Sequence, residues 1–436
     1  MYGEGGNVSN LWWGRAGLLL GGQAFSLVGS SIVQYAISWY LVMQTNSGIV
    51  VMLTMLMSCL PQAIVSLFAG AWSDRWNRKM LIILPDAVIA VITALLACAM
   101  GSGNASLALI LCILAIRSAG AGVQTPAVQS FIPQITPEAK LLRVNSVNGG
   151  IQSVNMIASP AIAAVLVNML PLWQILFVDV LTAIIGVCCV ALIRFAHVRQ
   201  QANTEHHTEN VWRSLLSDTA EGFGYAWQRP RIRSVLLCYA LVCFLNTAPM
   251  NLTLVLINRV FQGQSLDFGV LSLSSSSDKL AADQLAWSLG MVVGNVWLSS
   301  VGAKRITNTM KVIASAFMAM GVLTAMLGLA PTVLVYLIVD CAVGFATAMS
   351  AAPTFTMLQQ EVPPDRQGRV FGLLTTFSSF GTPLGLLVFG PLSDIMNIRL
   401  VFILGGILTI PAGIWIEHVN RTHRVQQLCV EEPLAD

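Results

Sequence analysis

The sequence predicts an all-α integral membrane protein with twelve transmembrane helices, arranged as two pseudo-symmetric six-helix bundles. Three observations lead to this prediction: the composition, the number of long apolar stretches, and a loop pattern that occurs twice. Of the 436 residues, 56% are hydrophobic and 10% are charged, and the mean hydropathy is +0.73. Average soluble domains have about 45–50% apolar and about 25% charged residues. A soluble fold could not bury this much apolar surface, so we expect a lipid bilayer around the chain.

Twelve stretches are long enough to cross a bilayer, because a hydrocarbon core of ~30 Å needs about 20 mainly apolar helical residues. The connections are short except for a polar segment, 194–233, and a serine-rich segment, 259–283, which has no functional interpretation. The first long connection predicts an N-terminal bundle (1–193), a central cytoplasmic loop (194–233), a C-terminal bundle (234–418) and a cytoplasmic tail (419–436). The predicted spans are 16–43, 49–71, 80–100, 105–127, 146–168, 171–193, 234–258, 284–303, 309–330, 332–352, 371–391 and 398–417.

Lysine and arginine in the loops predict the orientation, since cytoplasmic loops have an excess of both. With the N-terminus inside, 19 of the 23 basic residues lie in cytoplasmic segments, 3 lie outside, and Arg117 lies within a span. We therefore expect a multi-pass protein of the cell inner (plasma) membrane with both termini in the cytoplasm.

An internal repeat relates the two bundles. The loops "QITPEAKLLRV" from Gln134 and "QEVPPDRQGRV" from Gln360 share one pattern at an offset of 360 − 134 = 226 residues. The same offset relates the basic pair Arg78 and Lys79 to Lys304 and Arg305. Parallel repeats of this kind predict a substrate site between the halves near the membrane midplane, with the halves moving around it.

The stretch "GAWSDRWNRK" between the second and third spans resembles a motif of the major facilitator superfamily. The family pattern Gly-x-x-x-Asp-Arg-x-x-Arg-(Lys/Arg) matches Gly70, Asp74, Arg75, Arg78 and Lys79. The later stretch "QEVPPDRQGRVFG", with Arg366 and Arg369, resembles the macrolide-efflux branch, which includes exporters of drugs and of siderophores. The resemblance extends over nearly the whole chain and implies the major facilitator fold.

The acid in this loop indicates more than orientation, because a topology signal needs no carboxylate. Asp74 could pair with a basic group or a helix N-terminus of the opposite half when the cytoplasmic side is closed. Family resemblance implies the same gating role. The second-half copy, "SSVGAKR", has no Asp-Arg pair, so gating is expected to depend mainly on the first-half loop. Accordingly, Asp74→Asn is expected to lower efflux from resistant cells without lowering expression, and unchanged efflux would contradict the role.

Four ionisable residues fall inside predicted spans: Asp86, Arg117, Asp179 and Asp340. Such groups are expensive to insert, at about 2.5–3.5 kcal/mol each, and therefore indicate function by default. Arg117 and Asp179 are alternatively a structural ion pair within the N-terminal half. Asp340 has no evident basic partner, which suits a proton carrier or a binder of cationic substrate. For Asp86, pairing with the nearby basic loop is the favoured interpretation.

Two polar stripes lie on helices that the family resemblance places around the cavity. Each stripe occupies one helix face, so it either lines the cavity or bonds neighbouring helices. The first stripe comprises Gln23, Ser26, Ser30 and Gln34, and the second comprises Tyr239, Asn246, Met250 and Thr253.

These features predict a secondary active exporter of amphiphilic small molecules, macrolide-like drugs first, and hence a protein of antibiotic resistance. The sequence has no Gly-x-x-x-x-Gly-Lys-(Ser/Thr) loop for a nucleotide. We therefore expect no cofactor and a proton-coupled antiporter, acting as a monomer by alternating access. An exporter of a siderophore or another self-made metabolite is the nearest alternative, and an importer or a lipid flippase is a further one.

Functions outside transport fit the sequence less well. No basic stripe indicates a nucleic-acid partner. An enzyme or a metal site in the membrane is not expected, because the five histidines all lie in predicted cytoplasmic segments: 197, 206, 207, 418 and 423. A non-transporting receptor or structural protein is the alternative from another class.

Overall fold

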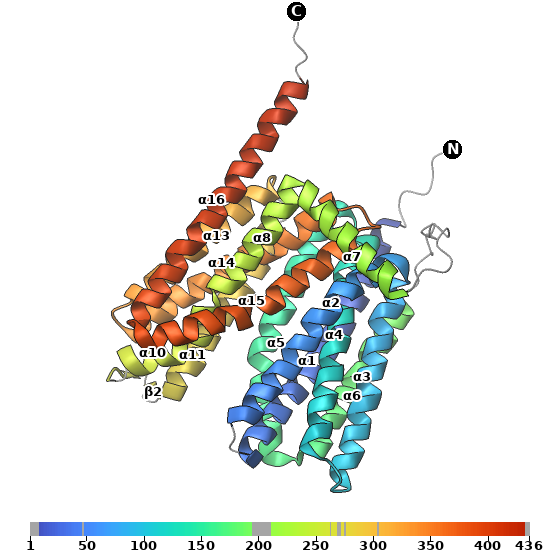
Figure 1. Cartoon of the computed structure of the whole chain (residues 1–436), viewed down its shortest axis with the longest axis vertical. Helices are drawn as coiled ribbons and strands as arrows, with labels where there is room; N and C mark the ends of the chain where they lie inside the picture. The colour runs from blue at the N-terminus through green and yellow to red at the C-terminus, as the bar shows by residue number, and fades with distance from the viewer. Residues whose placement is uncertain are drawn as a thin grey trace, which may run out of the picture. The chain divides into compact units, whose positions relative to one another are not determined.

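The computed structural model (Figure 1) describes residues 8–45, 48–193, 211–261, 263–267, 272–273, 276–302 and 305–431. Within these ranges the chain is almost entirely helical, and eleven helices are long and apolar enough to cross a membrane. Large apolar side chains such as Leu95 and Leu181 are 63% and 62% exposed, as expected for helix faces that lipid covers. The predicted all-α membrane fold is confirmed.

Two compact units divide the chain, and each combines segments that are distant in sequence. Unit 1 comprises Met1–Val144, Val154–Gly224 and Val362–Ser379, and unit 2 comprises Asn145–Ser153, Tyr225–Glu361 and Phe380–Asp436. Two helices therefore contribute to both units: α5 (Leu141–Met169) and α15 (Gln367–Ile395). A single cut at the central loop would not produce this division.

Unit 1 is built around α3 (Arg78–Gly101), which packs between α4 (Leu107–Ile135) and α6 (Leu172–Leu192) (Figure 1). Helix α1 (Val8–Thr45) packs on α6, and α2 (Gly48–Arg75) packs on α4. A short 3₁₀ turn, η1 (Glu138–Lys140), follows α4. The core of this unit includes Ile32, Val33, Leu96, Leu114, Ile175 and Leu176.

In unit 2, α11 (Ser276–Trp297) packs along α14 (Val333–Glu361), and α14 packs on α13 (Thr309–Leu329). Helix α13 in turn packs on α16 (Ile398–Glu431). Helix α11 continues into a π turn, η2 (Leu298–Gly302). The serine-rich segment contains a short antiparallel ladder of two strands, β1 (Leu266–Asp267) and β2 (Ser272–Leu273). The core of this unit includes Leu256, Phe261, Leu327, Tyr336, Val401 and Phe402.

The predicted span 234–258 is not one continuous helix. It consists of α8 (Pro230–Leu245), α9 (Thr247–Asn251) and α10 (Thr253–Val260). None of the three is long enough to cross a membrane alone, so the described chain has eleven long helices instead of twelve.

Proline and polar side chains explain the break. Pro249 has no N–H, and in a continuous helix its ring would clash with the carbonyl of Leu245. Asn246 Nδ2 donates to the Val242 carbonyl at 2.9 Å, and Thr247 Oγ1 donates to the Cys243 carbonyl at 3.2 Å. Both carbonyls belong to the last turn of α8, directly before the break, so polar side chains bind the backbone where the helix ends.

Helices also occur beyond the predicted spans. The central polar segment contains α7 (Val211–Gln228), whereas residues 194–210 lie outside the described part of the chain. Helix α14 continues from the predicted end at residue 352 to Glu361. Helix α11 starts at Ser276 instead of residue 284. Hydropathy detects only the part of a helix inside the hydrocarbon, so polar turns at either end are missed.

Candidate functional site

The motif "GAWSDRWNRK" forms the end of α2, a turn and the start of α3. Asn77 caps α3, because its side chain accepts a hydrogen bond from the backbone N–H of Lys79 at 3.0 Å. The side chains of Asp74 and Arg75 lie outside the described part of the structure. Their gating role therefore stays a prediction.

Arg78 is a buried crosslink and not only an orientation signal. It is 3% exposed, and its guanidinium donates to three backbone carbonyls. Nε bonds Ser73 at 2.9 Å, Nη1 bonds Ser130 on α4 at 2.7 Å, and Nη2 bonds Pro364 just before α15. One side chain therefore joins the ends of α2 and α4 to the loop that leads into α15.

Lys79 binds a different set of carbonyls from Arg78. Lys79 Nζ donates to the carbonyls of Ala191 and Ile193 at 2.7 and 3.0 Å. Ala191 lies in the last turn of α6, and Ile193 directly follows the helix. A positive charge is favourable there because the C-terminal end of a helix has a partial negative charge. Arg78 and Lys79 thus both bind backbone carbonyls at or near the ends of helices.

Two glycines allow α2 and the first half of α15 to meet backbone to backbone. A Cβ atom at Gly70 would lie 2.5 Å from the Gly368 carbonyl oxygen, and one at Gly372 would lie 2.5 Å from that of Ser66. Further along the same contact, Thr376 Oγ1 donates to the Ala63 carbonyl at 3.1 Å. No side chain fits at either glycine without displacing backbone, which explains why the motif needs glycine at position 70.

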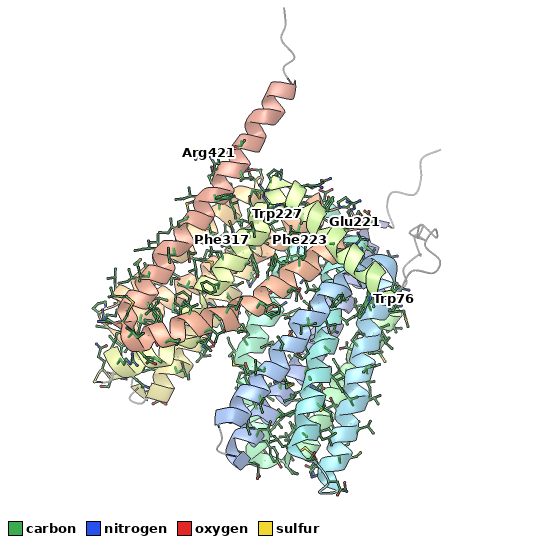
Figure 2. All side chains as sticks on the ribbon, in the orientation of Figure 1. Trp76, Glu221, Phe223, Trp227, Phe317 and Arg421 are labelled. Atoms are coloured by element: carbon green, nitrogen blue, oxygen red, sulfur yellow. The ribbon has the colours of Figure 1, made fainter. Side chains whose placement is uncertain are left out.

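The second-half basic residues differ from one another in their placement. Arg369 Nη1 lies 2.7 Å and Arg366 Nη2 lies 3.3 Å from the carboxylate of Glu221. Glu221 lies on α7, where Figure 2 labels it. Arg305 is exposed, and Lys304 lies outside the described residues. Sequence reasoning missed Glu221, because the central segment was expected to be a loop without structure.

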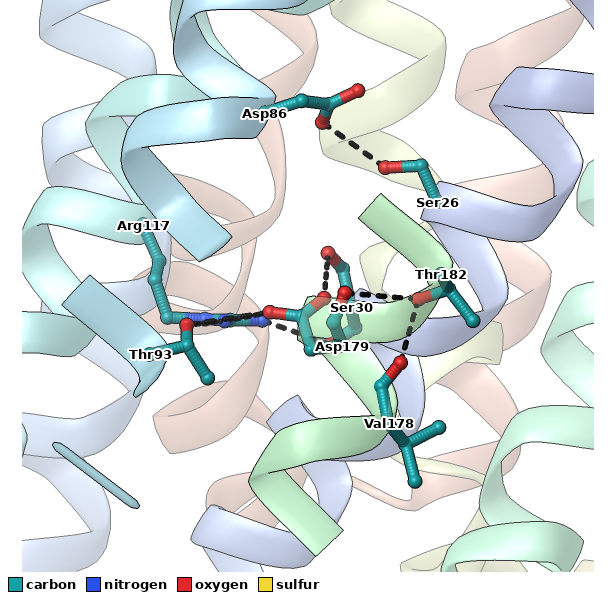
Figure 3. A network of polar contacts seen from close by, with 8 residues as sticks. All are labelled: Ser26, Ser30, Asp86, Thr93, Arg117, Val178, Asp179 and Thr182. Atoms are coloured by element: carbon teal, nitrogen blue, oxygen red, sulfur yellow. Dashed lines mark hydrogen bonds and ion pairs between the residues drawn. The ribbon is translucent and has the colours of Figure 1, made fainter. Parts of the chain in front are cut away.

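Arg117 and Asp179 form a buried ion pair within unit 1 (Figure 3). Their side chains are 6% and 0% exposed. Asp179 also accepts from Ser30 Oγ at 2.7 Å and from Thr93 Oγ1 at 3.3 Å. The pair thus links α4 to α6, with α1 and α3 supplying hydroxyl groups, as the structural interpretation of these two charges predicts.

Asp86 does not pair with the basic loop, so that prediction is wrong. It is buried on α3 and accepts a hydrogen bond from Ser26 Oγ at 3.0 Å, while its second oxygen meets no donor among the described residues (Figure 3). Seven residues of helix separate Asp86 from Lys79, which is about 10 Å of rise. Because Lys79 is bound to the end of α6, it cannot also reach Asp86.

The polar stripe of α1 makes contacts between helices of unit 1. Ser26 and Ser30 bind Asp86 and Asp179, and Gln34 Nε2 donates to Ser58 Oγ on α2 at 2.7 Å. Gln23 Nε2 is buried and has no acceptor among the described residues. Interhelical bonding accounts for most of this stripe, and a part in lining a cavity stays a prediction.

The second stripe lies on the broken helix. Asn246 and Thr253 are buried at its breaks, and Thr253 Oγ1 lies 3.1 Å from the hydroxyl of Tyr336 on α14. Tyr239 is half-buried, and Met250 is exposed. Discontinuous helices often form binding sites in transporters, so this break marks a candidate site for substrate.

Asp340 has an acidic neighbour instead of a basic one. Asp283 on α11 and Asp340 on α14 are 4% and 5% exposed, and they lie side by side because the backbones of their two helices meet one turn further on, at Trp287 and Gly344. The Tyr336 hydroxyl lies beside Asp283. Two negative charges 4 Å apart repel by about 4 kcal/mol at an effective dielectric constant of about 20, so both carboxyls cannot be ionised together without cost.

Sequence reasoning missed Asp283 because it lies one residue before the predicted span 284–303. The preceding serines indicated a loop, although α11 already begins at Ser276. The spacing of Lys279 and Asp283 by one helical turn was the available signal that the helix starts earlier.

Comparisons with known proteins agree with this architecture. The family model of the Major Facilitator Superfamily matches residues 19–385 and 280–428. Macrolide efflux protein A of Streptococcus pyogenes is 27% identical over 420 residues, covering 95% of this chain and 98% of that protein. The multidrug efflux pump Tap of Mycobacterium tuberculosis is 24% identical over 403 residues, covering 89% and 90% of the two chains.

Solved structures show the same fold at low sequence identity. The human organic anion transporter MFSD10 matches with a TM-score of 0.75 and 16% identity, over 93% of this chain and 99% of that one. A bacterial homologue of the iron transporter ferroportin matches with a TM-score of 0.70 and 12% identity, over the same shares. The motif resemblance is thereby confirmed, and the chain belongs to the Major Facilitator Superfamily of membrane transporters.

Proposed function

We propose that this protein exports amphiphilic small molecules, macrolide-like drugs among them, by proton-coupled antiport and alternating access. The observation that supports it most is the alignment with macrolide efflux protein A, which extends over 95% of this chain and 98% of that protein. Similarity to a multidrug efflux pump over 89% of the chain favours the same class of substrate.

Buried carboxyl groups favour the proton as the coupling ion. Asp86 and Asp340 each lie inside a helix, and neither makes an ion pair among the described residues. An acid without a base in a membrane protein can bind and release a proton at modest cost, which is how many proton relays work. Transport would then use the proton gradient and no bound cofactor.

Contacts around the motif support a gating role for this part of unit 1. Arg78 binds the loop directly before α15. Gly70 and Gly372 allow the first half of α15 to pack closely against α2. In our proposal these contacts form and break once in each transport cycle, on the cytoplasmic side of the inner membrane. Both termini would lie on that side, and a single copy would suffice for transport.

Everted membrane vesicles test the proposal. Vesicles from cells that express the chain should take up a radiolabelled macrolide when an acidic interior is imposed, and a protonophore should abolish the uptake. Vesicles with an empty vector are the control. Absence of macrolide uptake in vesicles that contain the protein would refute drug export, and uptake that resists the protonophore would refute proton coupling.

A further inference from the structure

The acid pair of unit 2 lies at matched depths in two parallel helices. Asp283 is 283 − 276 = 7 residues past the start of α11, and Asp340 is 340 − 333 = 7 residues past the start of α14. At about 1.5 Å per residue, both lie about 10 Å into their helices. One turn further along, the backbones of α11 and α14 are in close contact, since a Cβ at Gly344 would lie 2.0 Å from the Trp287 carbonyl oxygen. The two carboxyl groups are therefore held together by tight helix packing.

No base compensates the pair within the described part of the chain. Lys279, one turn before Asp283 on α11, donates its Nζ to the Phe261 carbonyl at 2.9 Å. On α10, Arg259 pairs with Asp394 at 2.8 Å. Both bases are therefore bound to other groups.

The remaining helices around the pair bring no compensating charge either. On α16, Arg399 donates to the Gly328 carbonyl, and on α13 the single basic residue, Lys311, lies near the opposite end of the helix. The titratable groups that face the pair are the Tyr336 hydroxyl and the Cys341 thiol, which are neutral donors.

A metal ion does not fit the pair. Calcium takes six to eight oxygen ligands and magnesium takes six, and the described residues contain no group of three or more acidic, histidine or cysteine side chains placed to hold a metal. Both carboxyls are also almost completely buried. A proton is the one cation that needs no further space or ligands.

Missing donors favour a proton on the pair. Oδ2 of Asp340 is buried and meets no donor among the described residues. The Thr253 hydroxyl donates to the Pro249 carbonyl and lies 3.1 Å from the Tyr336 hydroxyl, so it is bound away from the acids. A buried carboxylate without donors or a counter-charge is costly, and binding of a proton by the pair removes that cost.

We infer that Asp283 and Asp340 form a proton-binding site, in which the two carboxyls share a proton that leaves during the transport cycle. Tyr336 and Thr253 act as positioning residues, because their hydroxyl groups connect the acid pair to the break before α10. The release of the proton would leave two facing carboxylates, and their repulsion would loosen the contact between α11 and α14. This assignment rests on the proposed function, since it names the site of its coupling ion.

Infrared spectroscopy of the full chain in liposomes tests the site without any transport substrate. Because Asp86 is also a buried acid without a base, the spectra are recorded in the Asp86→Asn background. This protein should show the absorption of a protonated carboxyl group that disappears at alkaline pH and shifts in heavy water. Asp283→Asn and Asp340→Asn should each remove this signal, and Asp340→Glu should restore it. Asp394→Asn, at an exposed ion pair, is the matched control and should leave the signal unchanged. A signal that persists in both asparagine variants would overturn the inference.

Transport in proteoliposomes gives a second test. Two rates are compared: macrolide accumulation driven by a pH gradient, and counterflow, the exchange of labelled for unlabelled macrolide. One ligand typically changes the affinity for a coupled ligand by about 5–150-fold. The ratio of accumulation to counterflow should therefore decrease by a factor of about 5–150 in Asp283→Asn and in Asp340→Asn. An unchanged ratio in both variants would overturn the assignment, as would loss of coupling in Asp86→Asn alone.

Failures of the two proposals are distinguishable. If the wild type moves no macrolide at all, the proposed substrate is wrong, and the infrared signal still decides whether Asp283 and Asp340 share a proton. If macrolide accumulates but the infrared signal persists in both variants, export stands and the proton site lies elsewhere.

Discussion

Removal of one member of the buried Arg117–Asp179 pair is expected to destabilise unit 1 strongly. The variant Asp179→Asn keeps the size of the side chain but leaves the Arg117 guanidinium without a counter-charge. That guanidinium is 6% exposed, so water cannot solvate it in the native packing. Ser30 and Thr93 donate to different oxygens of Asp179, and the amide offers one acceptor oxygen in their place. Neither hydroxyl group can neutralise the arginine.

The magnitude follows from the burial of both partners. Breaking a buried ion pair by removing one partner costs about 3–5 kcal/mol, whereas replacing both partners is often close to neutral. The single variants Asp179→Asn and Arg117→Gln should each lose that amount of unfolding free energy. If the effects were independent, the double variant would lose about 6–10 kcal/mol. We expect the double variant to lose less than either single variant.

Reversible unfolding by SDS in mixed micelles, followed by circular dichroism, measures these differences. Asp394→Asn removes a partner from the Arg259–Asp394 pair, in which the aspartate is 73% exposed. An exposed pair is worth about 0–1 kcal/mol, so this control should change little. Additive losses in the double variant would show that the two charges do not stabilise each other, and would refute the reasoning.

Three further variants test the contacts around the motif. Gly70→Ala should lower macrolide efflux at normal expression, because overpacking costs about 1–3 kcal/mol. Gly21→Ala is the control and should leave efflux unchanged, because nothing lies within 4 Å of a new Cβ at that position. Arg78→Lys should destabilise the purified protein to heat, since an ammonium group cannot reach all three carbonyls of the guanidinium; an unchanged melting temperature would contradict the crosslink. Glu221→Gln should cost about 0–1 kcal/mol at low salt and less at high salt, since the exposed pairs of α7 are screened; a larger loss that ignores salt would point to a packing role instead.

Part of the fold and of the site could be predicted from residues close together in sequence. The positions of the long apolar segments and the motif at 70–79 depend on local composition. The Arg117–Asp179 pair was one of two alternatives, because two opposite charges at similar depth in one bundle rarely stay apart in a bilayer. Each of these features reflects the free energy of moving a short segment from water into lipid.

Other features were visible in the sequence but had ambiguous meaning. Pro249 is a helix breaker, yet proline also occurs inside α2 and α3 without interrupting them. Asp283 follows a run of serines that indicates a loop, although the helix begins before it. Local preference decides neither case, because neighbouring helices supply the partners that make a break or a buried acid tolerable.

The sequence by itself determined that this chain spans a membrane many times, where the apolar parts of its long helices lie, and which family motif joins α2 to α3. Only the tertiary structure decided which groups meet: Gly70 with Gly368, Arg78 with Pro364, and Asp283 with Asp340. The physical reason is that insertion into lipid depends on each segment separately, whereas such contacts depend on the rotation and the register of packed helices. Residues 298 positions apart along the chain (368 − 70) have no local pattern that relates them.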